Sequence, residues 1–195
     1  MEKTIAFRQK ADAESLAFQC FPTGSVLKLD SNAILVETRE NGYLLHPFSP
    51  DQETVIPEGG KWFAVNTAPF RQPVGFSDLC PYSISSIPGK SFSLGFHGLI
   101  ELSVAHIKGL SAWMERQDSM TMADILQAVR PDLKTQVTKA LKRVLGPEPY
   151  EMPRIIASGD AIQSACEESM FWLLYEKGIC VTPHSFFLEF APPNL

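Results

Sequence analysis

The amino-acid sequence predicts an α+β protein in which a mixed, mainly antiparallel sheet packs with about four helices. Three observations support this class. Strand-like segments separated by turn residues fill residues 25–48, and a two-residue alternation of apolar side chains occupies residues 92–104. Apolar residues then recur at helical spacing from residue 107 to residue 173. We therefore expect an N-terminal β-meander, a long central strand, several helices and a closing C-terminal strand.

Length and charge set the first limits on domain organisation and function. The chain has 195 residues, 45% hydrophobic and 20% charged, which suits one folded domain over residues 12–195 after an N-terminal extension at 1–11. A formal net charge of -5 lacks the basic field that binds phosphate backbones, so we expect no nucleic-acid partner. No apolar stretch approaches the ~20 residues that span a bilayer, and no signal-peptide pattern is present, which predicts a cytoplasmic protein.

The first half of the chain is predicted to consist mainly of strands. Residues 11–19 indicate a short helix before Pro22 and Gly24. Asn41-Gly42 indicates a tight hairpin between two strand patterns. The strand patterns of this half cover residues 25–29, 33–39, 43–48, 61–65 and 67–76. Prolines limit the pairing of the last of these, which predicts an edge strand, and residues 77–90 are predicted to be mostly loop.

Residues 92–104 carry the clearest periodic signal. Apolar side chains occupy its even-numbered positions, with Gly98 as the one gap, while most odd-numbered positions are polar. Such alternation predicts a half-buried strand with one core face. The predicted core face consists of Phe92, Leu94, Phe96, Ile100, Leu102 and Val104.

Helical patterns dominate after His106. Residues 107–117 carry an apolar stripe, and Thr121 followed by Asp124 predicts a capping box at the start of the next helix. Pro131 predicts a break or kink, with a further helical segment up to Gly146.

The last quarter of the chain returns to a strand. Residues 150–158 indicate a short extended segment, and Asp160 is predicted to cap a helix that ends at Gly178. Phe186, Leu188 and Phe190 alternate with other residues in the final strand, which Pro192 and Pro193 end.

Four segments together resemble the SPFH, or band 7, superfamily, especially its virion-core-protein-like branch. The first leads from a proline through Gly-Ser into two strands, and the second is a strand with a central glycine followed by a short helix. The third matches a pair of helices, and the fourth matches the last helix and the closing strand. The segments are "LAFQCFPTGSVLKLDSNAILVETRENG", "SFSLGFHGLIELSVAHIKGLSAWM", "MADILQAVRPDLKTQVTKALKRVL" and "AIQSACEESMFWLLYEKGICVTPHSFFLEFAPPNL".

This resemblance implies a function as well as a fold. Members of the superfamily, such as stomatin, prohibitin and flotillin relatives, are non-enzymatic scaffolds that self-assemble and organise membranes or recruit client proteins. The resemblance therefore implies a scaffold or adaptor whose partners are further copies of itself and protein clients, with peripheral membrane contact left open. The sequence lacks the family's N-terminal membrane anchor and its long coiled coil, so we expect small or partner-dependent assemblies in place of large rings.

Aromatic residues supply the candidate interface. The segment "MFWLLY" at 170–175 is apolar around more than one side of its predicted helix, which indicates either deep burial or an association surface. A second, smaller group lies at the end of the helix that begins at residue 107. The candidate interface residues are Trp113, Met114, Phe171, Trp172 and Tyr175.

No catalytic, cofactor-binding or metal-ligating residue is predicted. Cys20, Cys80, Cys166 and Cys180 are widely spaced and read as buried reduced thiols. The alternative function is a small α+β hydrolase or ligand-binding enzyme, for which a pocket joining His46, His97 or Cys180 would be evidence. Finally, a basic stretch can be read as a solvated helix face or as a contact for anionic lipid, and it contains Lys134, Lys139, Lys142 and Arg143.

Overall fold

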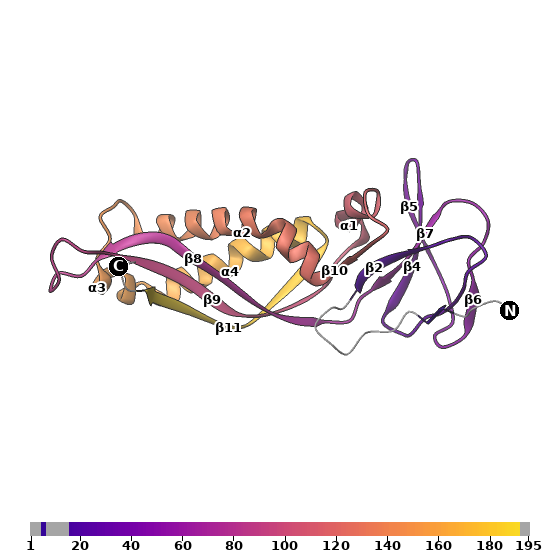
Figure 1. The fold of residues 1–195 in the computed structure, drawn as a ribbon, viewed down its shortest axis with the longest axis horizontal. Coiled ribbons are helices and arrows are strands. Elements are labelled where there is room, and N and C mark those ends of the chain that lie inside the picture. Colours follow the sequence, from indigo (N-terminus) through magenta and orange to yellow (C-terminus); the bar gives the residue numbers. More distant parts are fainter. Residues whose placement is uncertain (1–4, 7–15, 192–195) are drawn as a thin grey trace. The chain divides into compact units, whose positions relative to one another are not determined.

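The computed structural model describes residues 5–6 and 16–191, and within them the side chains of 16–182 and 187–190. Its contacts divide the chain into two compact units, whose elements are labelled in Figure 1. Unit 1 contains residues 1–70, 102–127 and 176–180, and unit 2 contains residues 71–101, 128–175 and 181–195. The described elements comprise four helices and mainly antiparallel strands, so the predicted α+β class is confirmed. The extent of a single domain over 12–195 stays a prediction.

Unit 1 is built on a five-stranded antiparallel sheet. Its strands are β2 (Leu16–Phe21), β4 (Ala33–Arg39), β5 (Gly42–His46), β7 (Lys61–Asn66) and β10 (Ser119–Thr121), in the order β10-β2-β7-β4-β5. A small second sheet contains β1 (Ile5–Ala6), β3 (Val26–Lys28) and β6 (Glu53–Val55). The hairpin predicted at Asn41-Gly42 is confirmed, because β4 and β5 pair with Arg39 opposite Gly42.

Two predictions for this region are wrong. The predicted meander is interrupted, because β3 belongs to the second sheet whereas β4 and β5 pair in the first. The helix predicted at 11–19 is a strand from Leu16 onward, and residues 11–15 lie outside the described part. Ala17 and Phe18 are completely buried. Pairing of β2 with β7 and β10 places them there, and such tertiary burial overrides a weak local helix preference.

The two faces of the five-stranded sheet carry different layers. On one face Leu35, Trp62 and Ala64 join a core with residues of the second sheet, including Leu27 and Ile56. On the other face lie Phe18 and Phe63, whose rings make an edge contact with centroids 5.7 Å apart. Helix α1 (Ile107–Met114) buries Ile107, Leu110 and Met114, and the Nζ of Lys61 donates to its last carbonyl, that of Met114, at 3.4 Å.

The start of α1 touches the 176–180 segment backbone to backbone. The amide groups of Ala105 and His106 both donate to the carbonyl oxygen of Gly178, at 2.7 and 3.3 Å. Gly178 has a φ of 83°, a left-handed value that favours glycine, as the sequence predicted. A Cβ placed on Gly109 would lie 2.1 Å from the nitrogen of Gly178, so neither glycine has room for a side chain.

Unit 2 contains most of a three-stranded sheet and most of the helical residues. The strands are β8 (Phe70–Ser83), β9 (Ser91–Val104) and β11 (Ile179–Ala191), in the order β11-β9-β8. Figure 1 shows α2 (Met122–Leu145) and α4 (Gly159–Glu176) alongside this sheet, with the short α3 (Met152–Ala157) near one end. The alternating strand is confirmed, since Leu94, Phe96, Ile100 and Leu102 are each at most 1% exposed. The edge position of β8 is also confirmed, although β8 runs on through residues 77–83, where a loop was predicted.

The helix ends show which local signals were decisive. The capping box is confirmed, because the amide of Asp124 donates to Thr121 Oγ1 at 3.0 Å and the amide of Thr121 donates to Asp124 Oδ2 at 3.0 Å. Of the break or kink predicted at Pro131, the break is wrong, since α2 continues through it. Val129 and Leu133, which lie before and after this proline, are both buried.

Two further boundaries differ from the prediction. Residues 152–157 form helix α3 where an extended segment was predicted, because Pro153 lies in the first turn, a position that suits proline. Helix α4 begins at Gly159, so Asp160 lies in its first turn and does not cap it. The amide of Ile162 donates to the carbonyl of Ser158 at 2.9 Å.

Candidate functional site

An exposed aromatic surface on α4 is the most prominent candidate site of unit 2. We use the name aromatic surface for Phe171, Trp172 and Tyr175. Trp172 is 57% exposed and Tyr175 is 41% exposed, while Phe171 is half-buried. The ring of Phe171 stacks on Tyr175 with centroids 5.7 Å apart, and it meets Trp172 edge-on at 5.3 Å. The three rings therefore form one connected apolar patch.

Helical spacing explains why these rings face outward. The buried side of α4 consists of Ile162, Ala165, Cys166, Met170 and Leu174. Positions 171, 172 and 175 lie on the opposite side of a helix with 3.6 residues per turn. Of the two neighbouring leucines, Leu174 is buried and Leu173 is half-buried.

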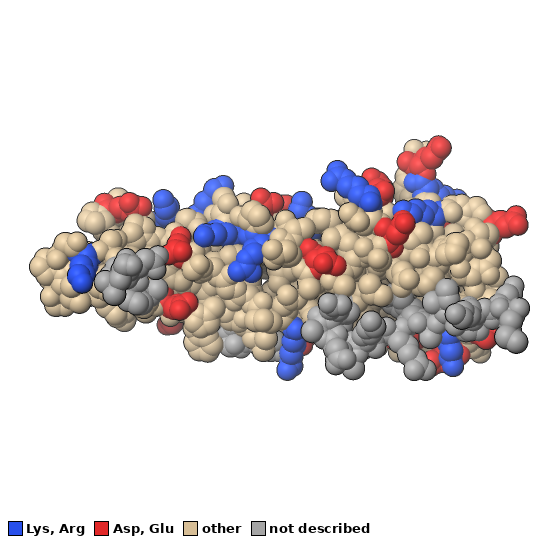
Figure 2. All heavy atoms as spheres, viewed as in Figure 1, with Lys and Arg blue, Asp and Glu red and all other residues tan. Residues whose placement is uncertain are grey.

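Charged residues border the aromatic surface. Glu168, one turn before Phe171 and Trp172, approaches Arg143 of α2, with Nη2 and Oε2 3.7 Å apart. The Nζ of Lys142, the neighbouring residue of α2, lies 3.6 Å from Oε1 of Glu148. Two residues of the basic stretch of α2, Lys142 and Arg143, therefore each have an acidic side chain within 4 Å. On the face drawn in Figure 2, Lys and Arg side chains are interspersed with Asp and Glu.

The other two predicted interface residues lie in unit 1. Met114 is 0% exposed and belongs to the core beneath α1, so its side chain is absent from the surface of the described chain. Trp113, its neighbour, is half-buried. The structure therefore brings together Phe171, Trp172 and Tyr175, and it does not place Met114 in a surface patch.

A buried carboxylate at the β4–β5 hairpin was not singled out from the sequence. Glu37 is 7% exposed, and its carboxylate accepts hydrogen bonds from Arg39 Nε and Nη2 at 3.0 and 2.9 Å. His46 Nε2 donates to the same group at 3.0 Å, and the His46 ring lies on Trp62 with centroids 4.4 Å apart. A sequence signal did exist, because Glu37 and Arg39 point to one face of a strand and His46 follows across a tight hairpin.

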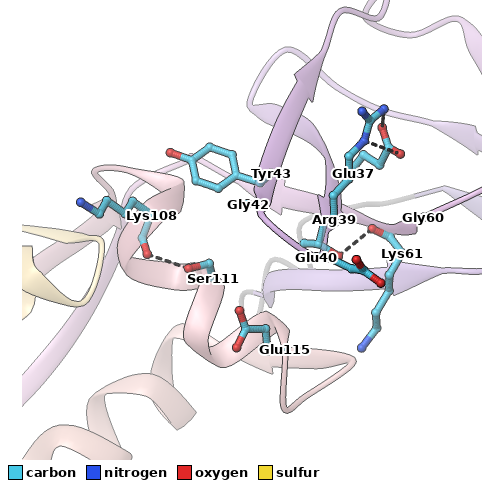
Figure 3. A pocket seen from close by; sticks show the side chains of 11 residues that line it. Glu37, Arg39, Glu40, Gly42, Tyr43, Gly60, Lys61, Lys108, Ser111 and Glu115 are labelled. Atoms are coloured by element: carbon cyan, nitrogen blue, oxygen red, sulfur yellow. Dashed lines mark hydrogen bonds and ion pairs between the residues drawn. The ribbon is translucent and has the colours of Figure 1, made fainter.

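A charged cleft lies between this hairpin and α1 (Figure 3), with a volume of about 1080 Å³. Figure 3 shows Glu37 and Arg39 turned toward each other and Tyr43 extending toward α1. Three acidic and three basic side chains line the cleft, so its charges balance. The charged lining residues are Glu37, Arg39, Glu40, Lys61, Lys108 and Glu115.

The hydrogen bonds that Glu37 accepts from Arg39 and His46 should stabilise the fold less at acid pH. Hydrogen bonds from Arg39, and then from His46, hold the pKa of Glu37 below its ordinary value of 4.5. A lowered pKa means that this contribution is present above the ordinary value and is lost as the pH falls through the folded-state value. We expect the thermal midpoint of the wild type to exceed that of Glu37→Gln near neutral pH, and the difference to shrink below a pH of about 4.5.

Differential scanning calorimetry across this pH range checks the prediction. Glu115→Gln removes a carboxylate from the opposite wall of the same cleft and serves as the control. A wild-type advantage over Glu37→Gln that stayed constant down to the acid limit of folding would contradict the role assigned to the carboxylate.

The residues proposed for an enzyme pocket are not gathered in this cleft. His46 contacts Glu37 and Trp62, whereas His97 of unit 2 has its Nδ1 3.7 Å from Oε2 of Glu189. Cys180 is half-buried in unit 1, and neither histidine nor cysteine lines the cleft. Among residues 5–6 and 16–191, no group of three or more His, Cys, Asp or Glu is placed to hold a metal ion.

The cysteines are free thiols, two of them deeply buried. Burial raises the pKa of the Cys80 thiol to about 11 and that of Cys166 to about 12, so both stay protonated and unreactive near neutral pH. Cys20 and Cys180 are half-buried, which is less burial than the sequence predicted. In the described part of the chain, every helix is too short or too polar to cross a membrane.

Comparison with known proteins adds no assignment. No family model matches the chain, and no curated protein matches it either. The resemblance to the SPFH superfamily therefore stays a prediction.

Proposed function

We propose that this chain is a non-enzymatic scaffold or adaptor that self-associates and recruits protein partners. The observation that supports the proposal is the aromatic surface of α4, three rings in mutual contact of which Trp172 is more than half exposed. The expected location is the cytoplasm. If the chain contacts a membrane surface, the basic residues of α2 would bind the anionic lipid headgroups.

The partner we assign to the aromatic surface is a second copy of the chain. Tryptophan and tyrosine are the side chains most enriched at the energetic centres of protein interfaces, and complete burial of a large apolar side chain is worth about 1.5–3 kcal/mol. The neighbouring Arg143 and Glu168 have opposite charges. In a two-fold symmetric contact the same patch meets itself, so each charge of this rim can face its opposite on the other copy.

The mass of the purified chain in solution tests this proposal. We expect light scattering to give a mass above the 21.6 kDa of one chain, and Trp172→Glu to lower that mass because it buries a charge in the contact. Ser164→Glu adds the same charge to an exposed position two turns earlier on α4 and should leave the mass unchanged. A wild type that stays at 21.6 kDa at every concentration would contradict self-association.

The alternative, a small α+β hydrolase or ligand-binding enzyme, has one observation in its favour. The cleft beside α1 is large enough for a small molecule and has charged walls. The residues named for this alternative, His46, His97 and Cys180, are not among those that line the cleft. The scaffold function is therefore the better supported of the two.

A further inference from the structure

Strand β5 is an exposed edge of the five-stranded sheet of unit 1. It is the terminal strand in the order β10-β2-β7-β4-β5, and its hairpin with β4 projects beyond the neighbouring strands (Figure 1). Three consecutive apolar side chains of β5 are exposed: Tyr43 by 36%, Leu44 by 42% and Leu45 by 57%. Because successive residues of a strand point to opposite faces, both faces of this edge are apolar.

Among the described residues, the other strands at sheet edges named here are short or carry features that discourage pairing. Strand β8 contains Pro73 and Pro81, and Asp78 within it has a φ of 55° that interrupts a regular strand. Strand β11 contains Pro183. Strands β6 and β10 have three residues each. Strand β5 has five residues without proline, lysine or carboxylate, and natural proteins seldom leave such an edge uncovered.

The register of the hairpin determines which backbone groups of β5 are available. Arg39 pairs with Gly42 across a two-residue loop, so this pair exchanges hydrogen bonds, and Leu44 and His46 continue the bonded series with β4. The backbone N–H and C=O groups of Tyr43 and Leu45 therefore point away from β4. A strand added at this edge must bond to these two residues.

We propose that β5 pairs with β5 of a second copy, antiparallel, about a two-fold axis at Leu44. In this register Tyr43 lies opposite Leu45 of the other copy, and both are residues whose backbone groups point outward. Leu44 meets its own symmetry mate at the close, non-bonded position of the ladder. Each exposed apolar side chain of β5 then gains an apolar cross-strand partner, and such pairs stabilise a sheet.

A second copy fits this edge better than a partner docked on one face. A helix laid on the sheet would cover either Leu44 or the pair Tyr43 and Leu45, whereas an added strand covers both sides. The strand contains no Asp, Glu, Lys or Arg, so symmetric pairing brings no like charges opposite each other. Pairing also closes, because each copy has one β5 and the joined sheet ends at a three-residue β10 on both sides.

Disulfide trapping tests both the contact and its register. Under mild oxidation, Leu44→Cys should form covalent dimers on the order of tenfold faster than Val55→Cys, since pairing raises the effective thiol concentration. Val55 is 61% exposed on β6 and provides the matched control, with the same native cysteines. A mixture of Tyr43→Cys and Leu45→Cys chains should cross-link faster than either variant alone. Equal rates for Leu44→Cys and Val55→Cys, or no gain in the mixture, would overturn the proposal.

A second variant separates this contact from the aromatic surface. Leu45→Lys places a charge at the paired edge and should lower the mass measured by light scattering, whereas Val55→Lys should not. Trp172→Glu should leave trapping through Leu44→Cys unchanged, because α4 and β5 belong to different units. If Trp172→Glu lowers the mass while Leu44→Cys fails to trap, self-association through α4 stands and pairing through β5 is wrong. Circular dichroism of each variant confirms that the fold is retained.

Discussion

Gly109→Ala is expected to destabilise unit 1 by about 3 kcal/mol, near the upper end of the usual cost of overpacking. The added methyl group would lie 2.1 Å from the nitrogen of Gly178 and 2.5 Å from its Cα. These neighbours are backbone atoms, which cannot turn aside as a flexible side chain can. The clash falls where Gly178 also accepts the amide hydrogen bonds of Ala105 and His106, so any displacement weakens these bonds too.

Denaturant unfolding monitored by tryptophan fluorescence measures this loss. Trp62 and Trp113 report on unit 1, and Trp172→Phe removes the signal of unit 2. Gly159→Ala is the matched control, because no atom lies within 4 Å of its added Cβ. An unfolding midpoint of Gly109→Ala equal to that of the control would show that α1 does not approach residue 178 this closely.

Met114→Ala is expected to cost about 2–5 kcal/mol, the range for truncating a fully buried large side chain. Met114 is 0% exposed, and its loss leaves a cavity beneath α1. Trp113→Ala, at the adjacent half-buried position, should cost less stability than Met114→Ala. The same unfolding experiment compares them.

The two possible roles of Met114 lead to opposite results. A core residue affects stability and leaves the mass of the assembly unchanged for the folded protein. If Met114→Ala instead unfolds like the wild type and lowers the mass measured by light scattering, Met114 belongs to an interface and not to the core.

Much of the strand content could be predicted because burial on one face imposes a two-residue period. In β9 the alternation of Leu94, Phe96, Ile100 and Leu102 identified the core face directly. The capping box of Thr121 and Asp124 was equally local, since its hydrogen bonds join residues three positions apart. Both signals depend only on near neighbours in the sequence, which is why the sequence could predict these two features.

Predictions from the sequence were wrong where contacts between distant parts of the chain decide the structure. Residues 16–19 resemble a helix locally, yet they become a strand because β7 and β10, far along the chain, pair on either side. The predicted meander failed for the same reason, since no local pattern shows that β3 belongs to a different sheet from β4 and β5. Pro131 lacks one amide hydrogen, but the buried stripe on both sides of it keeps α2 continuous.

The candidate surfaces were predicted in part. Residues 170–175 contain more apolar side chains than one face of a helix can bury, which indicated that some of them would be exposed. Trp172 and Tyr175 are indeed exposed. Met114 could have been assigned to the core, because it follows Ile107 and Leu110 at helical spacing. The exposed edge of β5 could not be predicted, since it depends on which strand ends the sheet.

The pairing of β10 with β2 also affects how the chain folds during synthesis on the ribosome. Ser119 lies opposite Gln19, so the sheet of unit 1 remains open at β2 until about a hundred further residues have been added. The close approach of α1 to Gly178 forms later still, after residue 178 has been added. The growing chain must therefore keep its first strands from misassociating until β10 has been made, and a chaperone that shields extended apolar segments would be needed most in that interval.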